Sequence, residues 1–223
     1  MTDVVVFGAG KLAELLSLYI SNDENLRIVG FTVDSGYLPS GGRLGSLPVV
    51  PWETLEQDFP PDEVMILGPV SYRDNNRFRW NRYLEGKRRG YSFATYIHPS
   101  SHVVGAEIGE NSIILEECTV QPFARLGPCS VLWSKVHIGH HAEIGDACFF
   151  ASFSGIAGNS RVGSRSFFGG QTGLVDNCSV GADCIVAAGT VVTRPMPDGA
   201  VARGGKVRIL ENAANRFGKT LLG

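Results

Sequence analysis

From residue 101 to residue 196 the chain can be divided into blocks of six residues that repeat one pattern without a break. The third residue of the six-residue block is often Gly, and the sixth is nearly always Ala, Ser, Thr or Cys. An ordinary β-strand pattern would not keep an apolar residue at one phase of six over this length. The second residue is apolar in block after block, at Ile108, Ile114, Val120, Leu126, Leu132, Ile138, Ile144, Phe150, Ile156, Val162, Phe168, Leu174, Val180, Val186 and Val192.

This period indicates a chain that winds in triangular coils. Each block is one short strand plus a turn, and three blocks close a coil. The apolar residue points inward, the small sixth residue fits the corner, and Gly relieves backbone crowding near it. Successive coils pair as parallel strands roughly 4.8 Å apart, and a continuous core needs at least about three coils. We therefore expect a parallel β-helix over residues 101–206 and a C-terminal tail over residues 207–223.

Residues 1–100 follow a different pattern, in which apolar strand segments alternate with helical ones. The strand segments read VVVFGAG, RIVGFTVD and EVMILG; KLAELLSLYI reads as an amphipathic helix, and RDNNRFRWNRYLEGKRRG as a polar helix with a basic face. Strands that alternate with helices predict a parallel sheet of Rossmann type. The expected fold class is therefore an α/β Rossmann-like domain joined to an all-β parallel β-helix.

A glycine turn in the first domain is a candidate phosphate-binding element. Gly8, Gly10 and Lys11 stand in a G-x-G-x-x-[G/A] pattern between a strand and a helix, where backbone N–H groups can meet a phosphate. Asp34 ends the second strand, where a ribose-binding acid falls in such domains, and Gly68 ends a later one. A purely structural turn would show the same glycines. Because only about 95 residues precede the repeat, a complete dinucleotide fold does not fit.

Three of the chain's five histidines, His137, His140 and His141, stand together in HIGHHAEIGD. Acyl transfer to an amine or hydroxyl needs a base that works near neutral pH, and histidine supplies one. A surface histidine at a coil corner is the competing interpretation, and it is the one we prefer for His137.

The repeat resembles that of the hexapeptide-repeat acyltransferases. The whole chain, including the junction YIHPSSHV, resembles the nucleotide-sugar N-acetyltransferases and sialic-acid O-acetyltransferases of bacterial glycan synthesis. The resemblance implies a left-handed β-helix that binds acetyl-CoA and an α/β domain that binds a nucleotide-sugar. It also implies a homotrimer whose active sites lie between neighbouring subunits.

The resemblance also implies roles for individual residues. His140 stands four residues before the Ile of an I-G-D motif and would be the general base. Gly158, one coil further on, would offer its N–H to the thioester carbonyl and so be part of the catalytic site. Gly158, Gly170 and Ala188 would contact acetyl-CoA, and Arg203 or Lys206 would meet its phosphates.

Some positions depart from the pattern of that family. His141 stands where an acid usually follows the catalytic histidine, and Lys11-Leu12 replaces the usual residues of the glycine turn. The partner of His140 is therefore open: it could be a backbone carbonyl, Glu143 or Asp146, or the base could be arranged differently. Alternatively, the substrate amine could already be neutral when it binds, and proton transfer to the base would then need less assistance from a partner of His140.

Composition excludes several other classes of function. A formal charge of -2 does not suit a protein that binds nucleic acid by bulk electrostatics. No stretch reaches about 18 apolar residues and no basic leader begins the chain, so we expect a cytoplasmic protein without a membrane partner. The five cysteines form no CxxC pair, which argues against a zinc site and for buried core cysteines.

The sequence thus predicts an acetyl-CoA-dependent N-acetyltransferase that acts on the amino group of a nucleotide-linked amino-deoxy sugar, without a metal. O-acetylation of a sialic-acid-like sugar is the alternative within the same class. From other classes, a non-catalytic sugar-binding scaffold or a β-helix metal lyase remains. The lyase is disfavoured because His102, His137 and His141 lack the spacing of a three-histidine zinc site.

Overall fold

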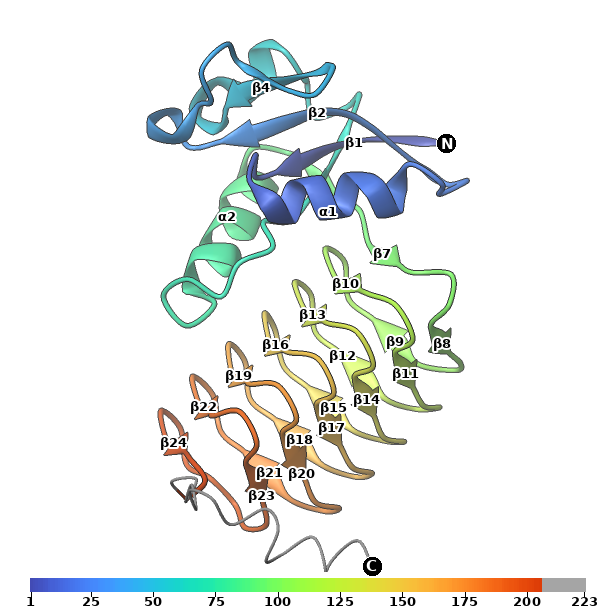
Figure 1. The fold of residues 1–223 in the computed structure, drawn as a ribbon, viewed down its shortest axis with the longest axis vertical. Helices are drawn as coiled ribbons and strands as arrows, with labels where there is room; N and C mark the ends of the chain where they lie inside the picture. The colour runs from blue at the N-terminus through green and yellow to red at the C-terminus, as the bar shows by residue number, and fades with distance from the viewer. Residues whose placement is uncertain (206–223) are drawn as a thin grey trace, which may run out of the picture.

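The computed structural model describes residues 1–205. An N-terminal α/β part sits at one end of a parallel β-helix (Figure 1). The end of the predicted β-helix and the predicted tail over 207–223 lie outside the described residues. The helical elements are α1 (Lys11–Ile20), η1 (Ser35–Tyr37), η2 (Trp52–Gln57) and α2 (Arg77–Arg88).

The N-terminal sheet has the order β3-β4-β2-β1-β5-β6, and every pair is parallel except β3 with β4. The last four residues of its central strand β1 are apolar and buried, and α1 packs a buried apolar side against the sheet. The chain runs from β1 outward to β2 and β4, and then returns to β5 on the other side of β1. The strands are β1 (Thr2–Phe7), β2 (Leu26–Val33), β3 (Arg43–Leu44), β4 (Leu47–Pro51), β5 (Met65–Leu67) and β6 (Ser92–Phe93).

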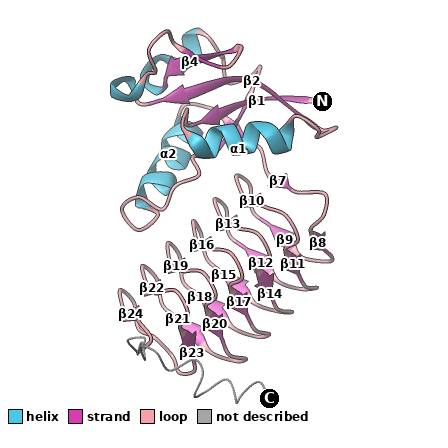
Figure 2. Ribbon diagram, in the orientation of Figure 1, coloured by secondary structure: helices cyan, strands magenta, loops and turns pink. Residues whose placement is uncertain are grey.

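The β-helix has three flat sides, each a parallel sheet of two-residue strands (Figure 2). The first side contains β7 (Tyr96–Ile97), β10 (Ile113–Ile114), β13 (Val131–Leu132), β16 (Phe149–Phe150), β19 (Phe167–Phe168), β22 (Ile185–Val186) and β24 (Val201–Ala202). The second contains β8 (His102–Val103), β11 (Thr119–Val120), β14 (His137–Ile138), β17 (Gly155–Ile156), β20 (Gly173–Leu174) and β23 (Val191–Val192). The third contains β9 (Glu107–Ile108), β12 (Arg125–Leu126), β15 (Glu143–Ile144), β18 (Arg161–Val162) and β21 (Ser179–Val180).

The turns between these sides stack into three corners. The histidine corner, between the second and third sides, comprises residues 121–124, 139–142, 157–160 and 175–178. The docking corner, between the third and first sides, comprises 109–112, 127–130, 145–148, 163–166 and 181–184. The remaining corner, between the first and second sides, comprises 115–118, 133–136, 151–154, 169–172 and 187–190.

The six-residue pattern has a direct physical basis in these coils. From β10 onward the second-position side chains are buried, and Phe150 and Phe168 stack inside with ring centroids 5.0 Å apart. Third-position glycines lie against the next coil, so that a Cβ on Gly109 would come within 2.4 Å of the Pro128 nitrogen. The fifth position has a positive φ and is usually not glycine, as at Asn159 (φ 56°). All five cysteines are free and buried, which confirms their prediction as core residues.

Helix α2 attaches the N-terminal part to the docking corner. Arg79, which is 1% exposed, donates from Nε to the Cys129 carbonyl (2.8 Å) and from Nη2 to the carbonyls of Ala147 (2.6 Å) and Cys148 (3.2 Å). Asn76, just before α2, donates to the carbonyl of Arg165 at 3.0 Å. The helix and the loop before it therefore bridge successive coils, and in Figure 1 α2 extends from the sheet toward them.

Candidate functional site

His140 lies in an exposed turn of the histidine corner. Its backbone N–H donates to Oε1 of Gln121 at 2.9 Å, one coil earlier, and its carbonyl accepts from the N–H of Asn159 at 2.9 Å, one coil later. Its Nδ1 lies 3.1 Å from Nδ1 of His141. The backbone is thus fixed by both neighbouring coils, while the imidazole remains accessible.

Gly158 lies directly against the imidazole of His140. A Cβ on Gly158 would come within 2.7 Å of both Cε1 and Nε2 of the ring, so only glycine allows this contact. Within the part of the chain that the structure describes, the Gly158 N–H donates to no protein acceptor. The ring of a candidate base therefore contacts a residue whose backbone N–H is available to act as an oxyanion donor.

Neither acid suggested as a partner of His140 is hydrogen-bonded to it. Glu143 pairs with Arg161 on the next coil at 3.1 Å. Asp146 lies at the docking corner, where burial raises the pKa of its carboxyl group. The imidazole of His140 instead lies against that of His141, whose ring packs on that of Phe123 with centroids 4.7 Å apart.

A hollow of about 370 Å³ opens beside His141 on the outside of the third side. Its charged residues are Glu107, Arg125 and Glu143, and Glu107 pairs with Arg125 at 3.4 Å. The hollow beside His141 is therefore lined by acidic and basic side chains and by the ring of Phe123.

Gly170 and Ala188 stack on each other at the corner between the first and second sides, where the Gly189 N–H donates to the Gly170 carbonyl at 2.9 Å. His140 and Gly158 lie together at a different corner. The sequence could have indicated this, because the spacing from His140 to Gly170 is not a multiple of the coil length. Of the two candidate phosphate contacts, Arg203 follows β24 and Lys206 lies outside the described residues.

The carboxyl ends of β1, β2 and β5 form a second candidate site in the N-terminal part. Gly10 precedes α1, and Gly8 has a φ of 130°, a backbone conformation that favours glycine. Gly8, Gly10 and Lys11 line a hollow of about 310 Å³ together with Val70. The N-terminus of a helix opening onto a hollow is a suitable place for an anionic group.

An adjoining hollow of about 230 Å³ is lined by Asp34 and by residues that the sequence did not single out. These include Tyr37, Arg73 and Phe78. The guanidinium groups of Arg73 and Arg82 lie over the Phe78 ring at 5.0 and 5.3 Å from its centroid. The basic segment RDNNRFR was visible in the sequence, but its position beside the glycine turn was not.

Two of the predicted substrate-binding residues already have protein partners. The carboxylate of Asp34 accepts from Nε (3.1 Å) and Nη2 (2.7 Å) of Arg82 on α2. The N–H of Gly68 donates to Oδ1 of Asn111 at 2.8 Å, and Asn111 Nδ2 donates back to the Gly68 carbonyl at 3.0 Å. Asp34 thus belongs to an ion pair, and Gly68 helps to join the sheet to the first coil.

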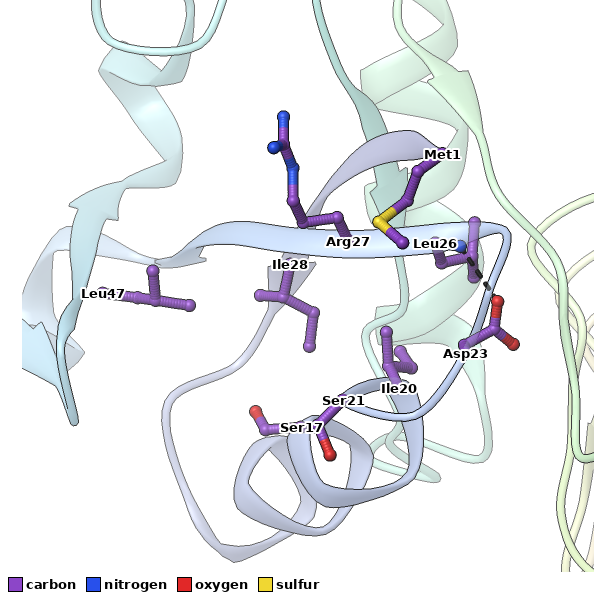
Figure 3. Close-up of a pocket in the computed structure, with 9 residues that line it drawn as sticks. All are labelled: Met1, Ser17, Ile20, Ser21, Asp23, Leu26, Arg27, Ile28 and Leu47. Atoms are coloured by element: carbon purple, nitrogen blue, oxygen red, sulfur yellow. Dashed lines mark hydrogen bonds between the residues drawn. The ribbon is translucent and has the colours of Figure 1, made fainter.

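Another hollow, of about 240 Å³, lies at the amino ends of β1 and β2 (Figure 3). Leu26, Ile28 and Leu47 line it from the sheet, and Ile20 lines it from α1, while the charged group of Arg27 points away. It is at the opposite end of β1 from the glycine turn and offers few polar groups, so we assign it no function.

Over residues 1–205, no group of three or more His, Cys, Asp or Glu side chains is placed to hold a metal ion. In the same range, no helix is both long and apolar enough to span a membrane.

No family model and no curated protein matches the sequence, but solved structures match the fold. A variant of perosamine N-acetyltransferase from Caulobacter crescentus, in complex with CoA and GDP-perosamine, has a TM-score of 0.80 and 23% identity over 92% of this chain and 94% of its own. The acetyltransferase domain of PglB from Neisseria gonorrhoeae, in complex with acetyl coenzyme A, has a TM-score of 0.80 and 21% identity over 93% and 98%. WeeI from Acinetobacter baumannii has 0.69 and 21% over 94% and 100%.

The chain has the fold of the perosamine N-acetyltransferase and of the PglB acetyltransferase domain. The similarity extends over both the N-terminal part and the β-helix, because it covers more than nine-tenths of the chain. The predicted β-helix architecture is thereby confirmed. At these levels of identity the likeness establishes the fold alone, so the activity has to be argued from the site.

Proposed function

We propose that this protein transfers the acetyl group of acetyl-CoA to the amino group of a nucleotide-linked amino-deoxy sugar, with His140 as general base. The observation that carries the proposal is the contact between the His140 imidazole and Gly158, whose N–H has no acceptor among the described residues. The Caulobacter and Neisseria structures of the same fold were solved with CoA and with acetyl coenzyme A, respectively, which supports this acyl donor.

The contact suggests how the reaction would proceed. The substrate amine attacks the thioester carbonyl carbon and passes a proton to Nε2 of His140. The negative charge that develops on the carbonyl oxygen is stabilised by the N–H of Gly158. The C–S bond then breaks, and the proton goes to the departing sulfur, so that the products are an amide and the free thiol of CoA.

A site assembled between copies accounts for the position of the other predicted contacts. Gly170 and Ala188 lie at another corner of the β-helix from His140, so one chain does not bring them together. In a homotrimer with parallel β-helices, the histidine corner of one subunit would face another corner of its neighbour. The pantetheine arm of acetyl-CoA would then lie between the two, touching Gly158 of one chain and Gly170 and Ala188 of the other.

The N-terminal part, as a Rossmann-like half-domain over residues 1–100, would bind the nucleotide-sugar. Backbone N–H groups at the start of α1 and the side chain of Lys11 would bind phosphate oxygens. Arg73 lies at the edge of the adjoining hollow and adds positive charge. Asp34 would act together with Arg82 rather than as a free carboxylate, and Gly68 would shape the backbone beside the sugar.

The decisive experiment is to measure thiol release from acetyl-CoA with a panel of UDP-, GDP- and dTDP-linked 4-amino sugars and free sialic acids. We expect one amino-sugar nucleotide to turn over and His140→Ala to abolish most of that turnover, by a factor of about 10² or more. His137→Ala is the matched control, because this exposed histidine lies on the second side in the same coil and should leave turnover unchanged.

Other results would redirect the proposal. Turnover of a sialic acid in place of the amino sugars would establish O-acetylation. Full activity in His140→Ala would exclude His140 as the base. Binding of a nucleotide-sugar with no thiol release would favour a scaffold.

A further inference from the structure

The two adjacent imidazoles at the histidine corner restrict each other's protons. Nδ1 of His140 and Nδ1 of His141 are 3.1 Å apart, within hydrogen-bond distance, and the two rings are inclined at 84°. Two N–H groups cannot point at each other at this distance, and two bare nitrogens would repel. One Nδ1 must therefore donate and the other accept.

The contact with Gly158 indicates which histidine donates. Nε2 of His140 faces Gly158, where the reaction would take place. To accept a proton there, Nε2 must be bare, and in a neutral imidazole the hydrogen is then on Nδ1. We propose that His141 is a positioning residue: its Nδ1 accepts a hydrogen bond from Nδ1–H of His140 and holds the base in the reactive tautomer. This inference rests on the function proposed above.

His141 is itself held in place by the coil before it. Its backbone N–H donates to the Pro122 carbonyl at 3.3 Å, and its ring packs on that of Phe123. Among the described residues, no carboxylate is hydrogen-bonded to either imidazole. The neighbouring acids Glu107 and Glu143 are each paired with an arginine, so the accepting role falls to a neutral side chain.

Two substitutions separate the accepting role of His141 from its structural role. His141 has a φ of 58°, and at the same phase of other turns the chain has Ala147 (φ 55°), Asn159 (φ 56°) and Asn177 (φ 56°). Both Ala and Asn are therefore compatible with the backbone. His141→Asn keeps an oxygen acceptor, whereas His141→Ala removes it.

The direct test is ¹⁵N NMR of the full chain labelled in its histidine rings, at a pH where His140 is neutral. His140→Ala and His141→Ala spectra assign the two rings. We expect the wild type to have hydrogen on Nδ1 of His140 and a bare Nε2, and we expect His141→Asn to keep this tautomer. His141→Ala should shift His140 toward the Nε2–H form. Hydrogen on Nε2 in the wild type, or no change in His141→Ala, would overturn the inference.

Kinetics on the sugar identified above provide a second readout. We expect kcat to fall roughly 10- to 100-fold in His141→Ala, with an unchanged KM for acetyl-CoA, and to fall much less in His141→Asn. Equal losses in the two variants would contradict an accepting role. The NMR result does not depend on turnover, so failure of the proposed function and failure of this inference are distinguishable.

Discussion

At the scale of single residues, the candidate site depends on the absence of one methyl group. The ring of His140 occupies the space that a side chain on Gly158 would need, with Cε1 and Nε2 both 2.7 Å from the position of its Cβ. These atoms are at the end of an exposed side chain, so an added methyl would displace the ring rather than the coil. The fold should tolerate the change, but the His140 ring would move away from the N–H of Gly158, the proposed oxyanion donor.

Gly158→Ala should therefore lower kcat/KM roughly 10²-fold, because a shift of about 1 Å in a reacting group has effects of that size. The thermal unfolding temperature should remain close to that of the wild type. Gly155→Ala is the matched control in the same coil, since its Cβ would meet nothing within 4 Å. If both variants kept full activity, the contact between His140 and Gly158 would have no role in the reaction.

At the scale of elements, α2 joins the N-terminal sheet to the coils through a buried guanidinium group. Among residues 1–205, no carboxylate pairs with Arg79; it donates instead to main-chain carbonyls of the docking corner, to the carbonyl of Ser71 and to Oδ1 of Asn76. Burial lowers its pKa to about 10, so it remains protonated at neutral pH. Its loss would leave several buried carbonyls without a donor.

Arg79→Ala should lower the free energy of unfolding by roughly 3–5 kcal/mol, the cost of removing one side of a buried charged network. Amide hydrogen exchange along α2 should accelerate, because the helix would lose its attachment to the coils. Arg88→Ala is the control on the same helix, since its side chain is exposed and should change stability by about 0.5 kcal/mol or less. An unfolding free energy unchanged by Arg79→Ala would show that other contacts suffice to dock the helix.

A second attachment, near the far end of the docking corner, should depend on pH. Asp183 accepts from Arg165 at 3.0 and 2.8 Å and from Arg77 at 3.0 Å. The hydrogen bonds and charge of Arg165 hold the pKa of its carboxyl group below the usual value. A lowered pKa in the folded state stabilises the protein above the unfolded value of about 4, and this stabilisation is lost as pH falls through the folded pKa.

Asp183→Asn should therefore destabilise the protein at pH 7 by about 1 kcal/mol, a small value because the ion pairs are partly exposed. The difference from the wild type should shrink in denaturant titrations below about pH 4, where the wild-type carboxylate becomes protonated. Glu143→Gln removes the more exposed pair with Arg161 and should change little at either pH. A difference that stayed constant down to pH 3 would mean that the charge of Asp183 is not its source.

At the scale of the whole molecule, the two candidate sites of one chain are separated by the body of the β-helix. Tyr72, in the loop beside the N-terminal hollow, packs on Phe149 and Phe167 of the first side, with centroids 5.3 and 5.4 Å apart. His140 lies at the corner between the second and third sides. In the homotrimer proposed above, a sugar bound at the N-terminal part would reach the base of a neighbouring copy rather than its own.

This arrangement predicts complementation between two inactive variants. His140→Ala lacks the base, and Lys11→Glu would repel the substrate phosphates at the glycine turn. Subunits of the two, dissociated and reassembled in equal amounts, should recover about a quarter of the wild-type thiol-release activity, because about a quarter of the sites would combine an intact base with an intact pocket. No recovery in the mixed trimers would place both halves of the site in one chain.

Much of the β-helix could be predicted from the sequence because its repeat is local. Each coil depends on an apolar residue, a glycine and a small residue at set phases of six, so the position of Ile144 or Val162 in the core follows from counting along the chain. The stacking of Gly158 on His140 follows in the same way, since the two are one coil apart. The same counting would have placed Gly170 at another corner.

Only the tertiary structure decided how the N-terminal part meets the coils. Three contacts join residues that are far apart in the sequence: the hydrogen bonds between Gly68 and Asn111, the ion pair of Asp34 with Arg82, and the hydrogen bonds of Arg79 to the docking corner. No period relates these positions, because their meeting depends on how α2 packs on the sheet and the docking corner together. The neighbour of the His140 ring was also undecided by the sequence: a backbone carbonyl, Glu143 and Asp146 were open, whereas the structure places Nδ1 of His141 3.1 Å from Nδ1 of His140.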